Sequence, residues 1–136
     1  MGLDLRLRMS RENEIAKEII DAAFKIHVGL GPGLLESVYE TVLFGELRKR
    51  GLDCERQVAI PVRFEDEVFE EGFRADIVVE NRVIVELKSV QDIHPVHPKI
   101  LLTYLRLSNI RLGLLINFGV SRIKDGISRV VNGLPE

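Results

Sequence analysis

The chain has 136 residues, 46% of them hydrophobic and 29% charged, and its formal net charge at pH 7 is −2. This is the composition of an ordinary soluble globular protein, so any nucleic-acid binding would need a local basic patch. No apolar run approaches the ~20 residues of a membrane span, no signal-peptide core is present, and the single cysteine, Cys54, excludes an internal disulfide. We expect a cytoplasmic protein without a membrane partner, built as an N-terminal arm (residues 1–10) and one domain (residues 11–136).

Two helices are predicted at the start of the domain. Apolar residues recur at helical spacing over residues 11–28, and a second helical stripe covers residues 34–50 after a glycine-rich break. Glu36, Tyr39 and Glu40 share one face of the second helix. From its position alone, Glu36 is most simply a carboxylate that the positive end of the helix dipole favours.

Strands dominate the middle of the chain. The first is predicted over residues 53–64, where Pro61 indicates an edge position or a bulge. The acidic run that follows, residues 65–71, lacks the glycine and ligand order of an EF-hand and is interpreted as a solvated hairpin tip. Residues 75–79 and 83–87 then flank Glu80-Asn81-Arg82, which is typical of a hairpin with a three-residue loop.

The last third predicts a crossover helix from about Pro98 or Lys99 to Ser108 and a strand, Leu112–Asn117, that is covered on both faces. Residues 122–132 predict a short strand or a turn of helix. Since a crossover brings the next strand alongside in parallel, the order α-α-β-β-β-α-β defines an α/β (α+β) fold with a mixed sheet flanked by helices.

Between the two hairpin strands lies the candidate active site. The three-residue loop places Val79 opposite Val83, and therefore Asp76 opposite Glu86 and Arg74 opposite Lys88. One face is then entirely apolar: Ala75, Ile77, Val79, Val83, Val85 and Leu87. The other carries two carboxylates and a lysine among buried apolar neighbours: Arg74, Asp76, Val78, Ile84, Glu86 and Lys88. Burying such charges is costly unless they are paired or bind a cation.

This arrangement is typical of metal-dependent phosphodiester cleavage. Two carboxylates on rigid strands offer hard oxygen ligands to Mg²⁺, which lowers the pKa of a bound water and neutralises phosphoryl charge. Lys88 could orient the attacking water or stabilise the transition state. By contrast, His94 and His97 are flanked by Pro95 and Pro98 and are interpreted as solvated loop residues rather than metal ligands.

Several separated motifs resemble those of one protein family, over about residues 13–132. The chain is similar to the GxxExxY family within the PD-(D/E)XK nuclease superfamily, whose core is a restriction-endonuclease-like arrangement of helix, three antiparallel strands, helix and strand. The matching stretches are Gly33-Leu-Leu-Glu36-Ser-Val-Tyr39, Phe73-Arg-Ala-Asp76, Val85-Glu86-Leu-Lys88, Leu102-Thr-Tyr104-Leu-Arg106 and Gly113-Leu-Leu-Ile-Asn-Phe-Gly119.

The resemblance implies roles for individual residues. Asp76 and Glu86 would hold Mg²⁺ or Mn²⁺, Lys88 would be the catalytic lysine, and Glu36 would join the site as a further acid and metal ligand. Tyr39 and Tyr104 would line the cleft, although packing explains both tyrosines equally well. Arg74, on the same strand as Asp76, is also expected to line it. In one departure, the family usually places glutamine four residues before the crossover-helix tyrosine, and Ile100 occupies that position here.

Two functions follow from these observations. The first is a nuclease that acts on DNA or RNA, and the second is a weakened module of the same fold that binds nucleic acid or a protein partner. We favour the nuclease because four costly charges face one cleft. A homodimer is also expected, because so small a chain has little surface to grip a duplex. The basic residues available for phosphate are Arg48, Lys49, Arg50, Arg106, Arg111, Arg122, Lys124 and Arg129, although scattered surface charge is the commoner explanation for any one of them.

Overall fold

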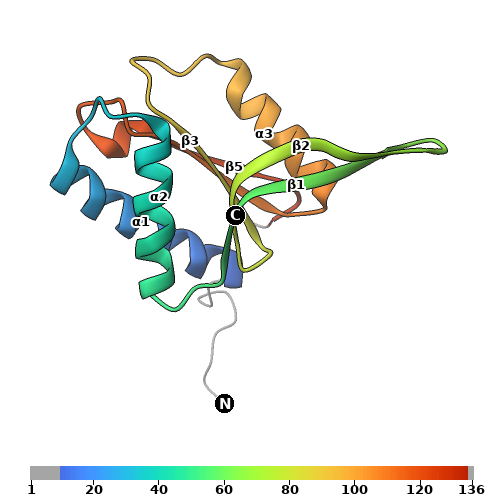
Figure 1. The fold of residues 1–136 in the computed structure, drawn as a ribbon, viewed down its shortest axis with the longest axis horizontal. Helices are drawn as coiled ribbons and strands as arrows, with labels where there is room; N and C mark the ends of the chain where they lie inside the picture. Colours follow the sequence, from blue (N-terminus) through green and yellow to red (C-terminus); the bar gives the residue numbers. More distant parts are fainter. Residues whose placement is uncertain (1–9, 135–136) are drawn as a thin grey trace.

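The structure, a computed structural model, describes residues 10–134 and contains a mixed five-stranded sheet with helices on both faces (Figure 1). The strand order is β1-β2-β3-β4-β5, and only the β3–β4 pair is parallel within this part of the chain. The predicted fold class and the order α-α-β-β-β-α-β are confirmed. The arm predicted over residues 1–10 lies, apart from Ser10, outside the described residues. The elements are α1 (Arg11–Leu30), α2 (Glu36–Lys49), β1 (Cys54–Phe64), β2 (Glu67–Val79), β3 (Val83–Lys88), α3 (Val96–Ser108), β4 (Leu112–Asn117), the 3₁₀ turn η2 (Ile123–Gly126) and β5 (Ile127–Val131).

Helices α1 and α2 pack together on one face of the sheet (Figure 1). The Ser10 hydroxyl caps α1 by accepting a hydrogen bond from the Asn13 N–H at 3.1 Å. Together the two helices and the strands beneath them bury a wholly apolar group that we call the helix-pair core. Its members include Ile15, Ile19, Leu43, Leu47, Ile77, Val79, Val83, Val85, Leu114 and Ile116.

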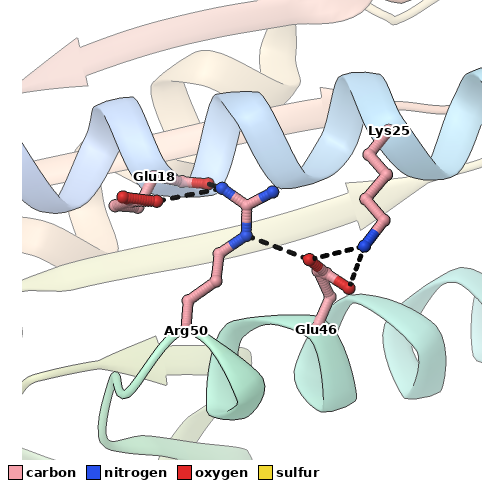
Figure 2. Close-up of polar contacts among 4 residues, drawn as sticks. All are labelled: Glu18, Lys25, Glu46 and Arg50. Carbon is pink, nitrogen blue, oxygen red and sulfur yellow. Dashed lines mark hydrogen bonds and ion pairs between the residues drawn. The ribbon is translucent and has the colours of Figure 1, made fainter.

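An ion-pair cluster joins α1 to α2 (Figure 2). The Arg50 guanidinium donates to Glu18 Oε1 at 2.9 Å and to Glu46 Oε2 at 3.1 Å. Lys25 Nζ lies 3.1 Å from each carboxylate oxygen of Glu46. Hydrogen bonds from Lys25 and Arg50 lower the pKa of Glu46. The cluster therefore adds polar contacts to the apolar packing between the two helices.

Helix α3 covers the opposite face over a smaller apolar group, the α3 core. Its buried members are Phe73, Ala75, Val78, Ile84, Leu101, Leu105 and Leu115. The helix begins at Val96, two residues earlier than expected, with Pro95 as its N-cap. Pro98 is accommodated because first-turn N–H groups have no partner within the helix. His97 consequently lies in the first turn of α3, which corrects its assignment to a loop.

The register of the β2–β3 hairpin is the predicted one. Val79 pairs with Val83, Val78 with Ile84 and Ile77 with Val85. β1 forms the outer edge of the sheet, and its register with β2 shifts between Ile60 and Val62, on either side of Pro61. Both structural readings of Pro61 are therefore confirmed. Beyond this shift, the β1–β2 hairpin projects away from the body of the molecule (Figure 1).

One predicted face is wrong. Ala75 was expected on the same face as Ile77, but it packs in the α3 core while Ile77 packs in the helix-pair core. The same reversal occurs in β1, where Cys54 contacts the helix-pair core and Val58 contacts the α3 core. In β1 the reversal coincides with Gln57, which lies between these two residues and has a left-handed φ of 50°.

Candidate active site

Asp76 and Glu86 lie where β2 and β3 stop pairing. The last residue pair of the β2–β3 ladder is Ile77 with Val85. Beyond it, carboxylate oxygens accept hydrogen bonds from backbone N–H groups of the other strand. Asp76 Oδ2 accepts from the Leu87 N–H at 2.9 Å, and Glu86 Oε1 accepts from the Asp76 N–H at 3.3 Å. The two acids are thus fixed to the backbone of the opposite strand and lie beside each other, although the predicted pairs Asp76–Glu86 and Arg74–Lys88 are not part of the ladder.

The environment disfavours the ionised form of Glu86. Burial raises the pKa of Glu86, and so does the neighbouring Asp76 carboxylate through its charge and a side-chain hydrogen bond, so that the pKa is about 8. The Asp76 N–H and Lys88 act in the opposite direction and do not cancel these effects. A buried carboxyl group beside a like charge is relieved by a shared cation, which is an arrangement typical of functional sites.

Glu36 is placed by the loop that precedes α2. α2 begins at Glu36 itself, with Leu35 as an extended N-cap. The carbonyl oxygen of Leu34 accepts a hydrogen bond from Ser89 Oγ at 2.5 Å, which ties this loop to the end of β3. Glu36 is exposed and lines a pocket, the Asp76 pocket, together with Leu35, Ser37, Glu40, Gln57, Asp76 and Leu87. Glu36 and Asp76 therefore border the same cavity.

Tyr39 does not line the cleft, which corrects the prediction. The side chain is 0% exposed and stacks on Phe118, with ring centroids 4.4 Å apart. Its hydroxyl donates to the Gly31 carbonyl at 2.6 Å and accepts from the Leu34 N–H at 3.2 Å. Tyr39 therefore holds the loop from the inside and thereby sets where α2 and Glu36 begin.

A second pocket, the Glu86 pocket, opens between β3 and α3. Its lining residues are Glu86, Lys88, His97, Ile100, Leu101, Tyr104 and Leu115. The rings of Tyr104 and Phe73 stack with their centroids 3.9 Å apart. Burial raises the pKa of Tyr104, and the charges of Glu86 and Asp76 add to this effect. Lys88 and Tyr104 thus border the same pocket as Glu86.

His97 is a residue of this pocket that the sequence interpretation missed. Partial burial lowers its pKa, and the charges of Lys88 and His94 lower it further against the opposing effect of Glu36. The charges of both Lys88 and Glu36 therefore act on His97. The signal in the sequence was Pro98 itself, which is compatible with a first helical turn as well as with a loop.

The remaining predicted residues lie away from the two acids. Arg74 Nε donates to Glu71 Oε1 at 2.7 Å and Arg74 Nη1 to the Gln57 carbonyl at 2.9 Å, so its guanidinium faces β1 and a neighbouring acid. Arg50 is engaged with Glu18 and Glu46 (Figure 2). Arg48, which stacks over Phe44, and Lys49 are at the opposite end of α2 from Glu36, about 20 Å away for a helix of this length.

Arg111 and Arg106 are two further members of the predicted basic set. Arg111 precedes β4 at the end that pairs with Val83, whereas Lys88 pairs with Asn117 at the other end, about 17 Å along the strand. Its guanidinium donates to the Gly133 carbonyl at 2.9 Å. Arg106 is exposed in the last turns of α3. A basic patch at the carboxylates is therefore not formed by Arg48, Lys49, Arg50 or Arg111.

The donor set at the hairpin fits a hydrated divalent cation. Within residues 10–134, no three His, Cys, Asp or Glu side chains are grouped so that they could hold a metal by themselves. The expected trio of Glu36, Asp76 and Glu86 is thus not gathered into one cluster, and Glu36 lies at the rim. Mg²⁺ nevertheless commonly binds through one or two carboxylates and keeps several waters, which Asp76 and Glu86 satisfy.

A mixed sheet with acids at the open end of a central hairpin and helices on both faces defines a restriction-endonuclease-like fold. Residues 13–130 match the family model described as the PD-(D/E)XK nuclease superfamily. The chain belongs to the PD-(D/E)XK nuclease superfamily. Enzymes of this superfamily typically use divalent metal ions.

Comparison with solved structures supports the fold. The chain is similar to "Crystal structure of SSO0001", with a TM-score of 0.55 and 19% sequence identity over 92% of this chain. It covers 63% of the SSO0001 chain, less than two thirds of that protein's length. At this identity the likeness bears on the fold alone. No curated protein matches the chain. Among the helices of the described residues, none is long and apolar enough to cross a membrane.

Proposed function

We propose that the protein is a nuclease of the GxxExxY family that hydrolyses phosphodiester bonds in DNA or RNA with Mg²⁺ or Mn²⁺. The observation that carries this proposal is the close approach of Asp76 to the half-buried Glu86 at the open end of the β2–β3 hairpin. Two like charges at one point disfavour the folded protein unless a cation joins them. The presence of both the Asp76 and the Glu86 carboxyl groups at this point therefore supports a function that needs a cation there.

Each residue of the site then has a definite task. Asp76 and Glu86 hold the cation, which supplies activation of water and neutralisation of phosphoryl charge when bound. Lys88, on the same strand as Glu86, contributes a positive charge where negative charge develops on the phosphate. Glu36 contributes a further acid from the rim of the Asp76 pocket. Tyr104 forms a wall of the Glu86 pocket.

The test is a cleavage assay on single-stranded, duplex and branched DNA and RNA with Mg²⁺, Mn²⁺ or EDTA. We expect cleavage with either metal and none in EDTA. Lys88→Ala removes one preorganised charge and should lower the rate about 10²–10³-fold while metal binding persists. Asp76→Ala should abolish metal binding and cleavage together. Lys17→Ala, an exposed lysine on α1, is the matched control and should cleave normally. Cleavage that survives either site substitution would contradict the assigned roles.

A second function is favoured by Ile100. This side chain is 38% exposed and lines the Glu86 pocket, where an apolar group neither orients a water nor binds phosphate. A module that binds nucleic acid or a protein without cleaving it would fit such a wall. It predicts nucleic-acid binding that is unchanged by EDTA and no heat of Mg²⁺ binding in calorimetry. The nuclease hypothesis predicts that EDTA changes nucleic-acid binding and that calorimetry detects heat of Mg²⁺ binding. Size-exclusion chromatography with light scattering tests the expected homodimer.

A further inference from the structure

Gln57 has an unusual backbone conformation for a residue within a strand. Its φ of 50° lies in the left-handed region, which is sterically unfavourable for a non-glycine residue. The other described non-glycine residues with positive φ are in turns or at a helix end: Glu65, Glu80, Asn81 and Asn109. Strain that persists in the middle of an edge strand requires contacts that hold it.

The side chain of Gln57 makes those contacts. Its amide nitrogen lies 2.7 Å from Glu40 Oε1 and 3.4 Å from Asp76 Oδ1, the second being a long hydrogen bond. A primary amide has two N–H groups and can therefore serve two carboxylates at once. Since Asp76 Oδ2 already accepts from the Leu87 N–H, Gln57 supplies a donor to the other oxygen of the same carboxylate.

Glu40 anchors this amide from α2. The Glu40 side chain is nearly buried, and its Oε2 accepts from Arg56 Nε at 3.2 Å and Arg56 Nη2 at 3.0 Å. Its Oε1 is left to Gln57. Arg56, Glu40, Gln57 and Asp76 thus form one continuous chain of hydrogen bonds from the edge strand through α2 to the acid pair. Glu40, Gln57 and Asp76 all line the Asp76 pocket.

The Gln57 amide carries no charge, and this bears on how Asp76 can bind a cation. A lysine or arginine at this position would place a fixed cation against Asp76 and compete with a metal ion, and a carboxylate would add a further negative charge. An amide donates hydrogen bonds without doing either. It orients the Asp76 carboxylate while leaving its charge for the cation. Groups of this kind, which hold a metal ligand from behind, commonly change metal affinity when they are replaced.

We propose that Gln57 is a positioning residue that orients Asp76 for a divalent cation, and that its left-handed backbone is what brings the amide to both carboxylates. This inference rests on the proposed role of Asp76 as a metal ligand. It assigns the edge strand β1 a part in the site, in addition to β2, β3 and α2. The backbone strain and the metal affinity are then two consequences of one residue.

Two variants test the proposal. Gln57→Gly accepts a φ of 50° freely but removes the amide, and Gln57→Asn tolerates the same φ but is one methylene too short to span both carboxylates. Affinity for Mn²⁺ is measured by calorimetry without nucleic acid, and Tm is measured in EDTA. We expect the affinity of both variants to fall about 10–100-fold while Tm in EDTA stays within a few degrees of the wild type. A purely structural residue would lower Tm and leave affinity unchanged.

The matched control is Glu65→Gly, which relieves a left-handed φ of 54° at the tip of the β1–β2 hairpin. Its affinity for Mn²⁺ should equal that of the wild type. If wild type binds Mn²⁺, Asp76→Asn does not, and both Gln57 variants match wild type, this inference fails and the proposed function stands. If wild type itself binds no Mn²⁺, Mg²⁺ or other divalent cation, both fail.

Discussion

The polar groups beneath the two faces of the sheet differ in whether their neighbours are favourable partners. On the α1–α2 face, the buried Glu40 is paired with Arg56, and the ring nitrogen of His27 lies 2.9 Å from the Val120 carbonyl. On the α3 face, Glu86 is buried against another acid, and its pKa rises to about 8. One face thus satisfies its polar groups and supplies stability. The other keeps a carboxyl group whose ionised form is unfavourable, as expected where a site binds something absent from the free chain.

The largest expected effect is a loss of stability from a substitution on the α1–α2 face. Leu43 is 0% exposed in the helix-pair core, so Leu43→Ala should lower the free energy of unfolding by about 2–5 kcal/mol, because a cavity remains where the side chain was removed. Urea denaturation measures this loss. Val42→Ala, a neighbouring partly exposed position on α2, should change stability by only about 0.5 kcal/mol. Equal losses in the two variants would contradict the division between the faces.

The next effect concerns Glu86 and pH. Because burial and Asp76 raise its folded pKa to about 8, above the ordinary value of 4.5, the folded state binds more protons between these two values. The contribution of Glu86 to stability is therefore full below about pH 4.5 and is lost as pH rises through 8. We expect a loss of about 2 kcal/mol, less than the whole shift implies because the group is partly exposed near Lys88.

Denaturation in EDTA at a series of pH values measures this slope. Glu86→Gln keeps the shape of the side chain without a titrating proton, so the slope should disappear. Glu65→Gln, at the exposed hairpin tip, should retain it. A slope that persists in Glu86→Gln would assign the pH dependence to another group and would weaken the contrast between the two faces.

The smallest effect concerns the ion pairs between α1 and α2. Arg50 is held by Glu18 and Glu46, so Arg50→Gln should lower the free energy of unfolding by about 1 kcal/mol, the upper range for exposed pairs (Figure 2). Nucleic-acid affinity, measured by fluorescence anisotropy, should not change. Lys49→Gln, the exposed neighbour, is the comparison. A larger loss of nucleic-acid affinity in Arg50→Gln than in Lys49→Gln would return Arg50 to the predicted binding set.

Much of the fold follows from local rules. The three-residue loop fixed the register of β2 and β3 as far as the pair Ile77–Val85, and hydrogen bonds between carboxylates and backbone N–H groups hold Asp76 beside Glu86 beyond that pair. The continuous apolar run in β4 correctly indicated a strand buried on both faces. The reversal at Gln57 was not predictable, because glutamine has no intrinsic preference for the left-handed region and its conformation depends on tertiary contacts.

The site was predictable in outline and not in detail. Glu36, Tyr39 and Glu40 share a helical face, but a face that wide reaches from solvent into the core, and Tyr39 lies at its buried edge. His97 was missed because proline next to histidine was interpreted as loop. Gln57 was missed because its role depends on a backbone conformation rather than on a sequence motif. The motifs located the acids and the lysine, and the contacts that orient them became visible only in three dimensions.

β1 has a consequence for how the protein behaves at high concentration. It is an edge strand, and such edges readily recruit strands from other molecules and cause aggregation. Pro61 lacks an N–H group, the register shifts beside it, and the left-handed Gln57 breaks the flat repeat of the strand. The exposed edge therefore cannot serve as a long template for another chain. Gln57, which we propose orients Asp76, thus also makes the β1 edge a poor template for fibre formation. Association between copies should therefore use surfaces other than this edge.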